Sequence, residues 1–154
     1  MKNIKIYFLL LTVIGLLSFS TVTKTTTKES DDNTKYVNTF IGTGGHGHTF
    51  PGATTPYGMV QLSPDTRTLG WDACGGYHYT DTSILGFSHT HLSGTGISDL
   101  GDFLFMPFSG EAKVIPGTPE DPDSGYRSRF NHDDEKSSPG YYSVLLKDYN
   151  IKAE

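Results

Sequence analysis

The chain has 154 residues, a formal net charge of −5 and a single cysteine, Cys74. One cysteine cannot form an internal disulfide, so the fold must be stabilised by packing. Because the lysines are scattered and form no basic patch, nucleic acid is not an expected partner.

The first 20 residues have the pattern of a secretory signal peptide. Lys2 and Lys5 form a basic start, residues 6–17 form an apolar core, and residues 18–20 form a small-x-small cleavage site. The apolar core is shorter than the about 20 residues that a membrane-spanning helix needs, so no membrane anchor is expected after cleavage. No cysteine lies near the cleavage site to carry a lipoprotein anchor. We therefore predict a secreted or periplasmic protein.

A linker and one folded domain follow the signal peptide. Residues 21–34 are rich in Thr, Lys, Glu and Asp, which is typical of a disordered linker. Residues 35–154 are the predicted domain. Its last strand begins at residue 151 and stops at 154, and a strand without its partner leaves backbone groups unpaired. We therefore expect the domain to be incomplete at its C-terminus.

Within the domain, short apolar runs recur every ten residues or so, separated by Gly, Pro, Asn and Asp. No helix-period segment of 11 residues or more interrupts them. The runs that we predict as strands are residues 36–41, 59–62, 83–91, 103–108, 111–115, 126–130, 141–147 and 151–154. Residues 103–108 are nearly all apolar, as in a strand buried on both faces, and Pro107 confines this strand to a sheet edge or a strand end. The pattern predicts an all-β fold, specifically an antiparallel β-sandwich.

The segment 36–110 is unusually poor in charge. Apart from aspartates its only charged residue is Arg67, and it contains neither Lys nor Glu. Such a composition is typical of a site that holds a polar ligand against aromatic faces. The single tryptophan, Trp71, lies between Gly70 and Asp72. We predict it on a loop rather than in the core, where its ring can cover the C–H face of a sugar.

Two histidine pairs are possible metal ligands. His46 with His48, and His89 with His91, have the spacing that puts both members on one face of a strand. Neutral imidazoles are good zinc ligands, but no carboxylate or third histidine follows at a recognisable spacing. Hydrogen-bonded structural histidines are therefore the simpler interpretation. Residues 42–47 resemble a phosphate loop but lack its Gly-Lys-Ser/Thr ending.

The residues alone assign no catalytic carboxylates. Acid–base hydrolysis of a glycoside needs two carboxyl groups on opposite sides of one bond. Asp72, Asp99 and Asp102 could supply them, but nothing in their spacing selects any of the three, and Asp99 and Asp102 also suit a turn.

A series of motifs resembles the beginning of glycoside hydrolase family 92. They are, in order, YVNTFIGT at 36–43, FPGA at 50–53, PYGMVQLSPD at 56–65, GGYHY at 75–79, GFSHTHLSGTG at 86–96 and DLGD at 99–102. The resemblance covers about residues 36–154. It implies a calcium-dependent exo-α-mannosidase of the α-1,2 type, exported by bacteria and releasing mannose from N-glycans or mannans with inversion.

The resemblance also implies the domain organisation of the full-length enzyme. In the family, an N-terminal β-sandwich packs on an (α/α)6 barrel, which carries the catalytic acid, the catalytic base and the calcium ligands. No residue of this chain receives those roles. The sandwich contributes one wall of the −1 subsite, and by resemblance we place Trp71 there, with His89, His91 and the loop around Phe50 and Gly52 as further candidates.

Two other functions stay open. One is a stand-alone carbohydrate-binding sandwich with Trp71 and Tyr77 or Tyr79 as its platform; the other is a small metalloprotein that uses the four paired histidines. Under the family 92 interpretation the 154-residue chain alone is inactive. We also expect the chain alone to be poorly soluble, because residues 103–108 and the site-facing loops would lack the barrel that covers them.

Overall fold

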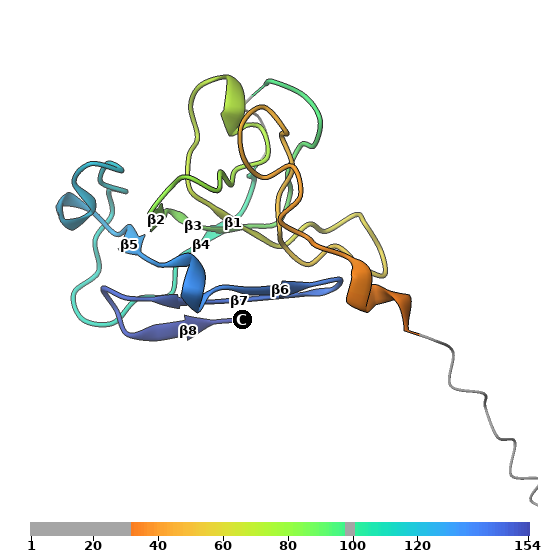
Figure 1. Cartoon of the computed structure of the whole chain (residues 1–154). Coiled ribbons are helices and arrows are strands. Elements are labelled where there is room, and N and C mark those ends of the chain that lie inside the picture. The colour runs from red at the N-terminus through yellow and green to blue at the C-terminus, as the bar shows by residue number, and fades with distance from the viewer. Residues whose placement is uncertain (1–31, 98–100) are drawn as a thin grey trace, which may run out of the picture. The chain divides into compact units, whose positions relative to one another are not determined.

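The computed structural model in Figure 1 describes residues 32–97 and 101–154, and Asn33–Glu154 form one compact unit. The predicted signal peptide and most of the predicted linker lie outside the described residues. The first 3-10 helix, η1 (Asn33–Tyr36), includes the last two positions of that linker. Among the described residues, no helix has the length and apolar character needed to cross a membrane.

The described part of the chain contains strands and short 3-10 helices, and no α-helix. The strands are β1 (Ser63–Asp65), β2 (Ser83–Ile84), β3 (Gly86–Ser88), β4 (Leu104–Phe105), β5 (Ser128–Arg129), β6 (Lys136–Ser138), β7 (Tyr141–Leu146) and β8 (Ile151–Ala153). The other 3-10 helices are η2 (Trp71–Ala73), η3 (Pro122–Ser124) and η4 (His132–Asp134). All strand pairs are antiparallel, which confirms the predicted all-β fold.

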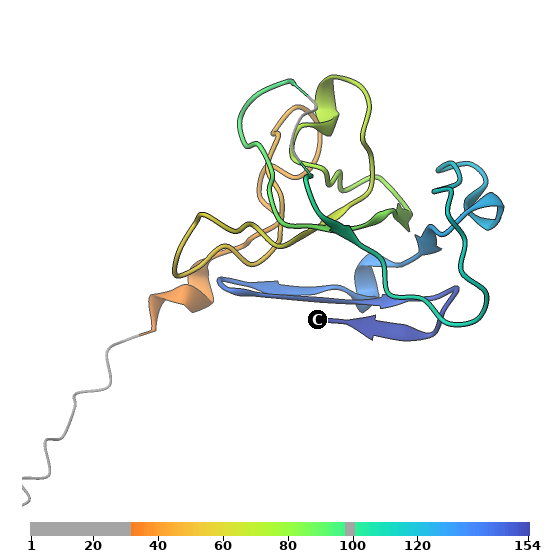
Figure 2. The same cartoon turned by 180° about the vertical axis from the view of Figure 1, so that it is seen from behind.

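The strands form three small sheets, ordered β1-β3-β4, β2-β5 and β6-β7-β8. In the first, Phe87 of β3 lies opposite Pro64 of β1 and Phe105 of β4. In the third, Tyr142 of β7 lies opposite Ser137. Figures 1 and 2 show the first and third sheets as two layers facing each other, which is the arrangement of a β-sandwich.

One hydrophobic core joins the layers. Tyr142, Val144 and Leu146 lie at alternate positions of β7 and are buried, as the period of two in a strand requires. Ile84 of β2 and Phe130, which follows β5, pack with them. Burying a side chain of this size stabilises a fold by about 1.5–3 kcal/mol. Tyr142, Val144 and Leu146 therefore form the face of β7 that meets the opposite layer.

A buried carboxylate lies at the edge of this core. Glu135, whose side chain is 1 % exposed, accepts hydrogen bonds from the hydroxyls of Tyr77 and Tyr142 and pairs with Nδ1 of His132. Burial, followed by the charge of Glu135, raises the pKa of Tyr77 and of Tyr142. Both phenols therefore stay protonated and act as donors, which compensates the buried negative charge.

Two predicted strands are wrong. Residues 36–41 end η1 and then form turns, with Ile41 N donating to Asn38 O and Thr43 N to Phe40 O. An apolar run becomes a strand only where a neighbouring strand takes its backbone bonds, and here those bonds are local. Residues 111–115 form no strand and are exposed along their whole length.

Other predicted strands are shorter or shifted. The predicted strand 59–62 contributes only the isolated bridge of Leu62 to Ala53, and β1 begins one residue later. The predicted strand 83–91 is divided into β2 and β3 at Leu85, whose amide donates to Asp65 O at 2.7 Å.

The prediction that residues 103–108 are buried on both faces is also wrong within this chain. Only β4 is strand, and Phe103 and Phe105 are 68 % and 60 % exposed. Among the described residues β4 pairs only with β3, so it forms an edge of its sheet, as Pro107 predicts. Apolar groups exposed together in this way mark a contact surface.

Candidate functional site

Three glycine-rich segments meet around Trp71, and we call them the tryptophan cluster: residues 42–48, 70–73 and 93–97. The amide of Gly94 donates to the carbonyl of His48 at 2.8 Å, which joins the first segment to the third. A Cβ added to Gly96 would lie 2.5 Å from two carbons of the indole of Trp71. Only glycine therefore allows the third segment to rest against the tryptophan ring.

Trp71 is presented to solvent and not to the core. It begins η2, directly after Gly70, and is 64 % exposed. The ring of His48 packs edgewise against it, with 5.6 Å between centroids. The prediction that Trp71 lies outside the core is thus confirmed, although the residue starts a short 3-10 helix and not a loop. The role of Trp71 as a sugar platform stays a prediction.

The first segment is a closed loop that fixes two histidines. Gly44 O accepts from Gly47 N, and Gly42 O accepts from Thr49 N, both at 3.2 Å. A Cβ added to Gly47 would lie 2.1 Å from Gly42 O, so the loop closes this tightly only with glycine. His48 has a φ of 54°, a left-handed conformation that is uncommon for a residue other than glycine.

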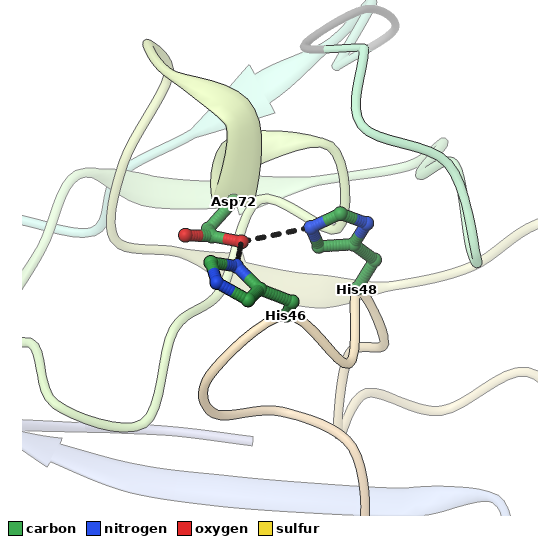
Figure 3. Close-up of side chains that lie close together, drawn as sticks. All are labelled: His46, His48 and Asp72. Carbon is green, nitrogen blue, oxygen red and sulfur yellow. Dashed lines mark hydrogen bonds and ion pairs between the residues drawn. The ribbon is translucent and has the colours of Figure 1, made fainter.

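Both histidines contact one carboxylate oxygen (Figure 3). Oδ1 of Asp72 lies 2.7 Å from Nδ1 of His46 and 2.8 Å from Nε2 of His48. The side chain of His48 is 7 % exposed, that of Asp72 23 %, and that of His46 79 %. The hydrogen bond to His46, followed by that to His48, lowers the pKa of Asp72. The carboxylate is therefore ionised at neutral pH.

His91 lies inside the domain, away from the surface of the cluster. Its Nε2 is 2.7 Å from Oδ1 of Asp65 and 2.8 Å from Oγ of Ser88, and its Nδ1 is 2.7 Å from Gln61 O. The side chain is 2 % exposed. Both ring nitrogens are thus engaged within the protein, and this histidine anchors the chain around β1 and β3.

Phe50 and Gly52 are half-buried. The ring of Phe50 packs on that of His91, with 5.0 Å between centroids, and contacts the hydrophobic core. A Cβ added to Gly52 would lie 2.0 Å from the carbonyl oxygen of Leu62, so this glycine permits a close approach of two backbones. Their placement supports the neighbouring loops, and a direct contact with substrate stays a prediction.

His89 belongs to a different surface. Its Nδ1 lies 3.0 Å from Phe103 O, and its ring packs edgewise on Phe105 and Phe103 at 5.1 and 6.2 Å. The histidine pairs therefore do not converge into one four-histidine metal site. Within residues 32–97 and 101–154, the group whose ligand atoms lie within 4.8 Å of one another is His46, His48 and Asp72.

This group does not fit calcium, because calcium takes about six to eight oxygen ligands and the group offers one carboxylate and two imidazole nitrogens. Nor do the candidate carboxylates form an evident acid–base pair. Asp72 is bound by two histidines, Asp102 accepts a hydrogen bond from Thr90, and Asp99 lies outside the described residues. No catalytic residue is therefore assigned in this chain.

Comparisons with known proteins match this architecture. The family model described as "Glycosyl hydrolase family 92 N-terminal domain" matches residues 36–154. An uncharacterized secreted glycosidase of Arthroderma benhamiae is 31 % identical over 153 residues, covering 94 % of this chain and 18 % of that protein.

Solved structures match as well. A family GH92 α-mannosidase from Bacteroides thetaiotaomicron, in complex with mannoimidazole, is 59 % identical with a TM-score of 0.75, covering 78 % of this chain and 16 % of that one. An inverting family GH92 mannosidase from the same organism is 34 % identical with a TM-score of 0.58, covering 75 % of this chain and 15 % of that one.

The chain thus spans less than a fifth of the length of each of these relatives. The family match extends over nearly the whole of the described domain, from the end of η1 to the last residue of the chain. This chain belongs to glycosyl hydrolase family 92, and residues 36–154 match the N-terminal domain of that family.

Proposed function

We propose that this chain is the N-terminal part of an exported exo-α-mannosidase that releases mannose from N-glycans or mannans, with the tryptophan cluster as one wall of the −1 subsite. One observation carries the proposal: a domain of family 92 holds a 64 % exposed tryptophan between glycine-rich segments. The mannosidase activity is supported by the solved relative at 59 % identity. Inversion is supported by the relative whose description includes it.

In this proposal the chain binds and orients the sugar. The exposed face of Trp71 covers the C–H face of a mannose ring, and polar groups beside it bind hydroxyls. Asp72 uses Oδ1 for both histidines, which leaves Oδ2 outside those two bonds and suited to accept from a sugar hydroxyl. Because its pKa is lowered, Asp72 is a poor general acid at neutral pH.

The acid and base of the proposed reaction therefore come from other parts of the protein. In an inverting enzyme these two carboxyl groups stand about 6.5–9.5 Å apart, with a water between them. We propose the (α/α)6 barrel as their source and as the source of the calcium ligands, which the histidine-rich cluster of this chain does not provide. The 154-residue chain alone is then inactive.

The test uses the full-length protein encoded by the gene that carries this chain. Release of mannose from an aryl α-mannoside and from α-1,2-linked mannobiose is measured, and NMR of the first product identifies its anomer. We expect β-mannose as the first product. Removal of calcium with a chelator is expected to abolish the activity, and added calcium to restore it.

The variant Trp71→Ala tests the role of the cluster. Truncating a tryptophan at the centre of a binding surface costs about 2 kcal/mol or more, so kcat/KM should fall about 30-fold. Leu69→Ala is the matched control, because Leu69 is an apolar side chain two residues away and is 85 % exposed. A protein that binds mannan through Trp71 but releases no mannose would instead support the carbohydrate-binding module.

A further inference from the structure

We propose that His46, His48 and Asp72 form a binding site for a divalent transition-metal ion, with zinc as the best-fitting candidate. The three side chains come from two segments of the tryptophan cluster, and both imidazoles point at Oδ1 of Asp72 (Figure 3). The site would lie beside the proposed sugar contact, and it does not depend on that contact. It differs from the predicted calcium site, whose ligands we place outside this chain.

The distances between the ligand atoms are close to those of a zinc site. In a tetrahedral site with zinc–ligand distances of about 2.0–2.2 Å, two ligand atoms are about 3.4 Å apart. Here Asp72 Oδ1 is 2.7 and 2.8 Å from the two nitrogens, and all three atoms lie within 4.8 Å of one another. An outward shift of the carboxylate oxygen by about 0.6 Å would therefore open the centre to a metal. Asp72 and His46 are partly or largely exposed and can make this shift by side-chain rotation.

The chemistry of the donors selects the kind of metal. Two imidazole nitrogens and one carboxylate oxygen suit zinc and other first-row divalent ions, whereas calcium and magnesium prefer oxygen ligands only. Three protein ligands leave a fourth position open, as in zinc sites that bind water or a substrate group. The exposure of His46 places that opening toward solvent.

The site is held in shape by the surrounding backbone. The closed loop from Gly42 to Thr49 fixes the two histidines on either side of Gly47. His48 is packed against Trp71, is 7 % exposed in its side chain and keeps an uncommon left-handed φ. Ligands that are ordered before the metal arrives lose less conformational entropy on binding, so this order favours affinity. A bound metal would also tie the loop to η2 next to the tryptophan.

A hydrogen-bonded group of the same three side chains without any metal also accounts for these distances. The experiment must therefore distinguish a metal site from a metal-free hydrogen-bonded group. Full-length protein is stripped with a chelator, freed of the chelator and dialysed against zinc, and the bound zinc per chain is measured. His46→Ala removes an exposed ligand. His48→Asn removes a ligand but keeps a residue that tolerates the left-handed backbone. His89→Ala is the control histidine, since it lies on the β4 surface.

We expect wild-type protein to bind one zinc per chain more than the double variant His46→Ala, His48→Asn, and each single variant to lose at least about tenfold in affinity. His89→Ala should bind zinc as wild type does. With cobalt in place of zinc, the visible absorption of wild type should change in the single variants, which reports direct ligation by nitrogen. Circular dichroism and thermal unfolding of the chelated proteins check that each variant is folded.

Equal zinc binding by wild type and the double variant would overturn the proposal. If His48→Asn does not fold, His46→Ala alone decides, because its side chain is 79 % exposed and carries no core contact. The measurement needs no substrate, so its failure leaves the proposed mannosidase function standing, and the reverse is also true.

Discussion

A methyl group at position 96 should displace Trp71, and this offers a test of the cluster that leaves the tryptophan itself in place. In the variant Gly96→Ala the new Cβ would lie 2.5 Å from Cε3 and Cζ3 of the indole, while ordinary contacts begin at 3.4 Å. The ring must therefore retreat by about 0.9 Å, the difference between these two distances. A misplacement of about 1 Å at a positioning group can cost about 100-fold in rate.

We expect Gly96→Ala to lower kcat/KM for an aryl α-mannoside by about 10- to 100-fold, which corresponds to about 1.4–2.7 kcal/mol of transition-state stabilisation. Gly58→Ala is the matched control, because a Cβ at Gly58 meets nothing within 4 Å. Full-length proteins are compared at several substrate concentrations. If Gly96→Ala keeps wild-type kcat/KM while Trp71→Ala loses it, the contact between Gly96 and the indole does not position the ring, and the reasoning is refuted.

Three further predictions concern stability, pH and the isolated chain. Glu135→Ala leaves the buried hydroxyl of Tyr142 without its acceptor and that of Tyr77 with only a long contact of 3.5 Å to His132 Nδ1, at about 1–3 kcal/mol each, so the free energy of unfolding in urea should fall by about 2–6 kcal/mol. Although burial opposes it, hydrogen bonding from Arg67 lowers the pKa of Asp81 below its model-compound value of 3.8. A lowered folded-state pKa stabilises the fold above about pH 3.8 and loses that contribution as pH falls through the folded value. Acid unfolding between about pH 4 and 2 should therefore depend on pH less steeply in Asp81→Asn than in wild type. The purified 154-residue chain should turn over no aryl α-mannoside and should self-associate on sizing chromatography, and turnover or a monodisperse monomer would contradict the respective expectation.

The parts of the fold that could be predicted are those determined by the local sequence pattern. Strand β7, with the sequence YYSVLL, is a run of aromatic and aliphatic residues broken only by Ser143, and its position follows from that composition. The position of Trp71 outside the core was also predictable, because glycine precedes it and no apolar run surrounds it.

The histidine–aspartate group could not be predicted, because it depends on how two loops meet. Asp72 is separated by 26 and 24 residues from His46 and His48, and no periodic signal links those positions. The predicted strand over residues 36–41 was wrong for a related reason. Its composition suits a strand, but strand formation needs a neighbouring strand in the right place, which depends on the tertiary fold.

The exposed aromatic groups of the domain fall into two kinds, and their neighbours distinguish them. Trp71 lies next to an ionised carboxylate and two imidazoles, the mixture of an apolar face with polar groups that a sugar requires. Phe103 and Phe105 both pack against His89, whose Nδ1 is already engaged with a backbone carbonyl. That surface offers apolar area and few free polar groups, which suits contact with protein. The exposed fractions of Trp71, Phe103 and Phe105, 64 %, 68 % and 60 %, do not separate the two kinds. Their neighbouring groups do, and these support the proposed sugar contact at Trp71 and a contact with protein over β4.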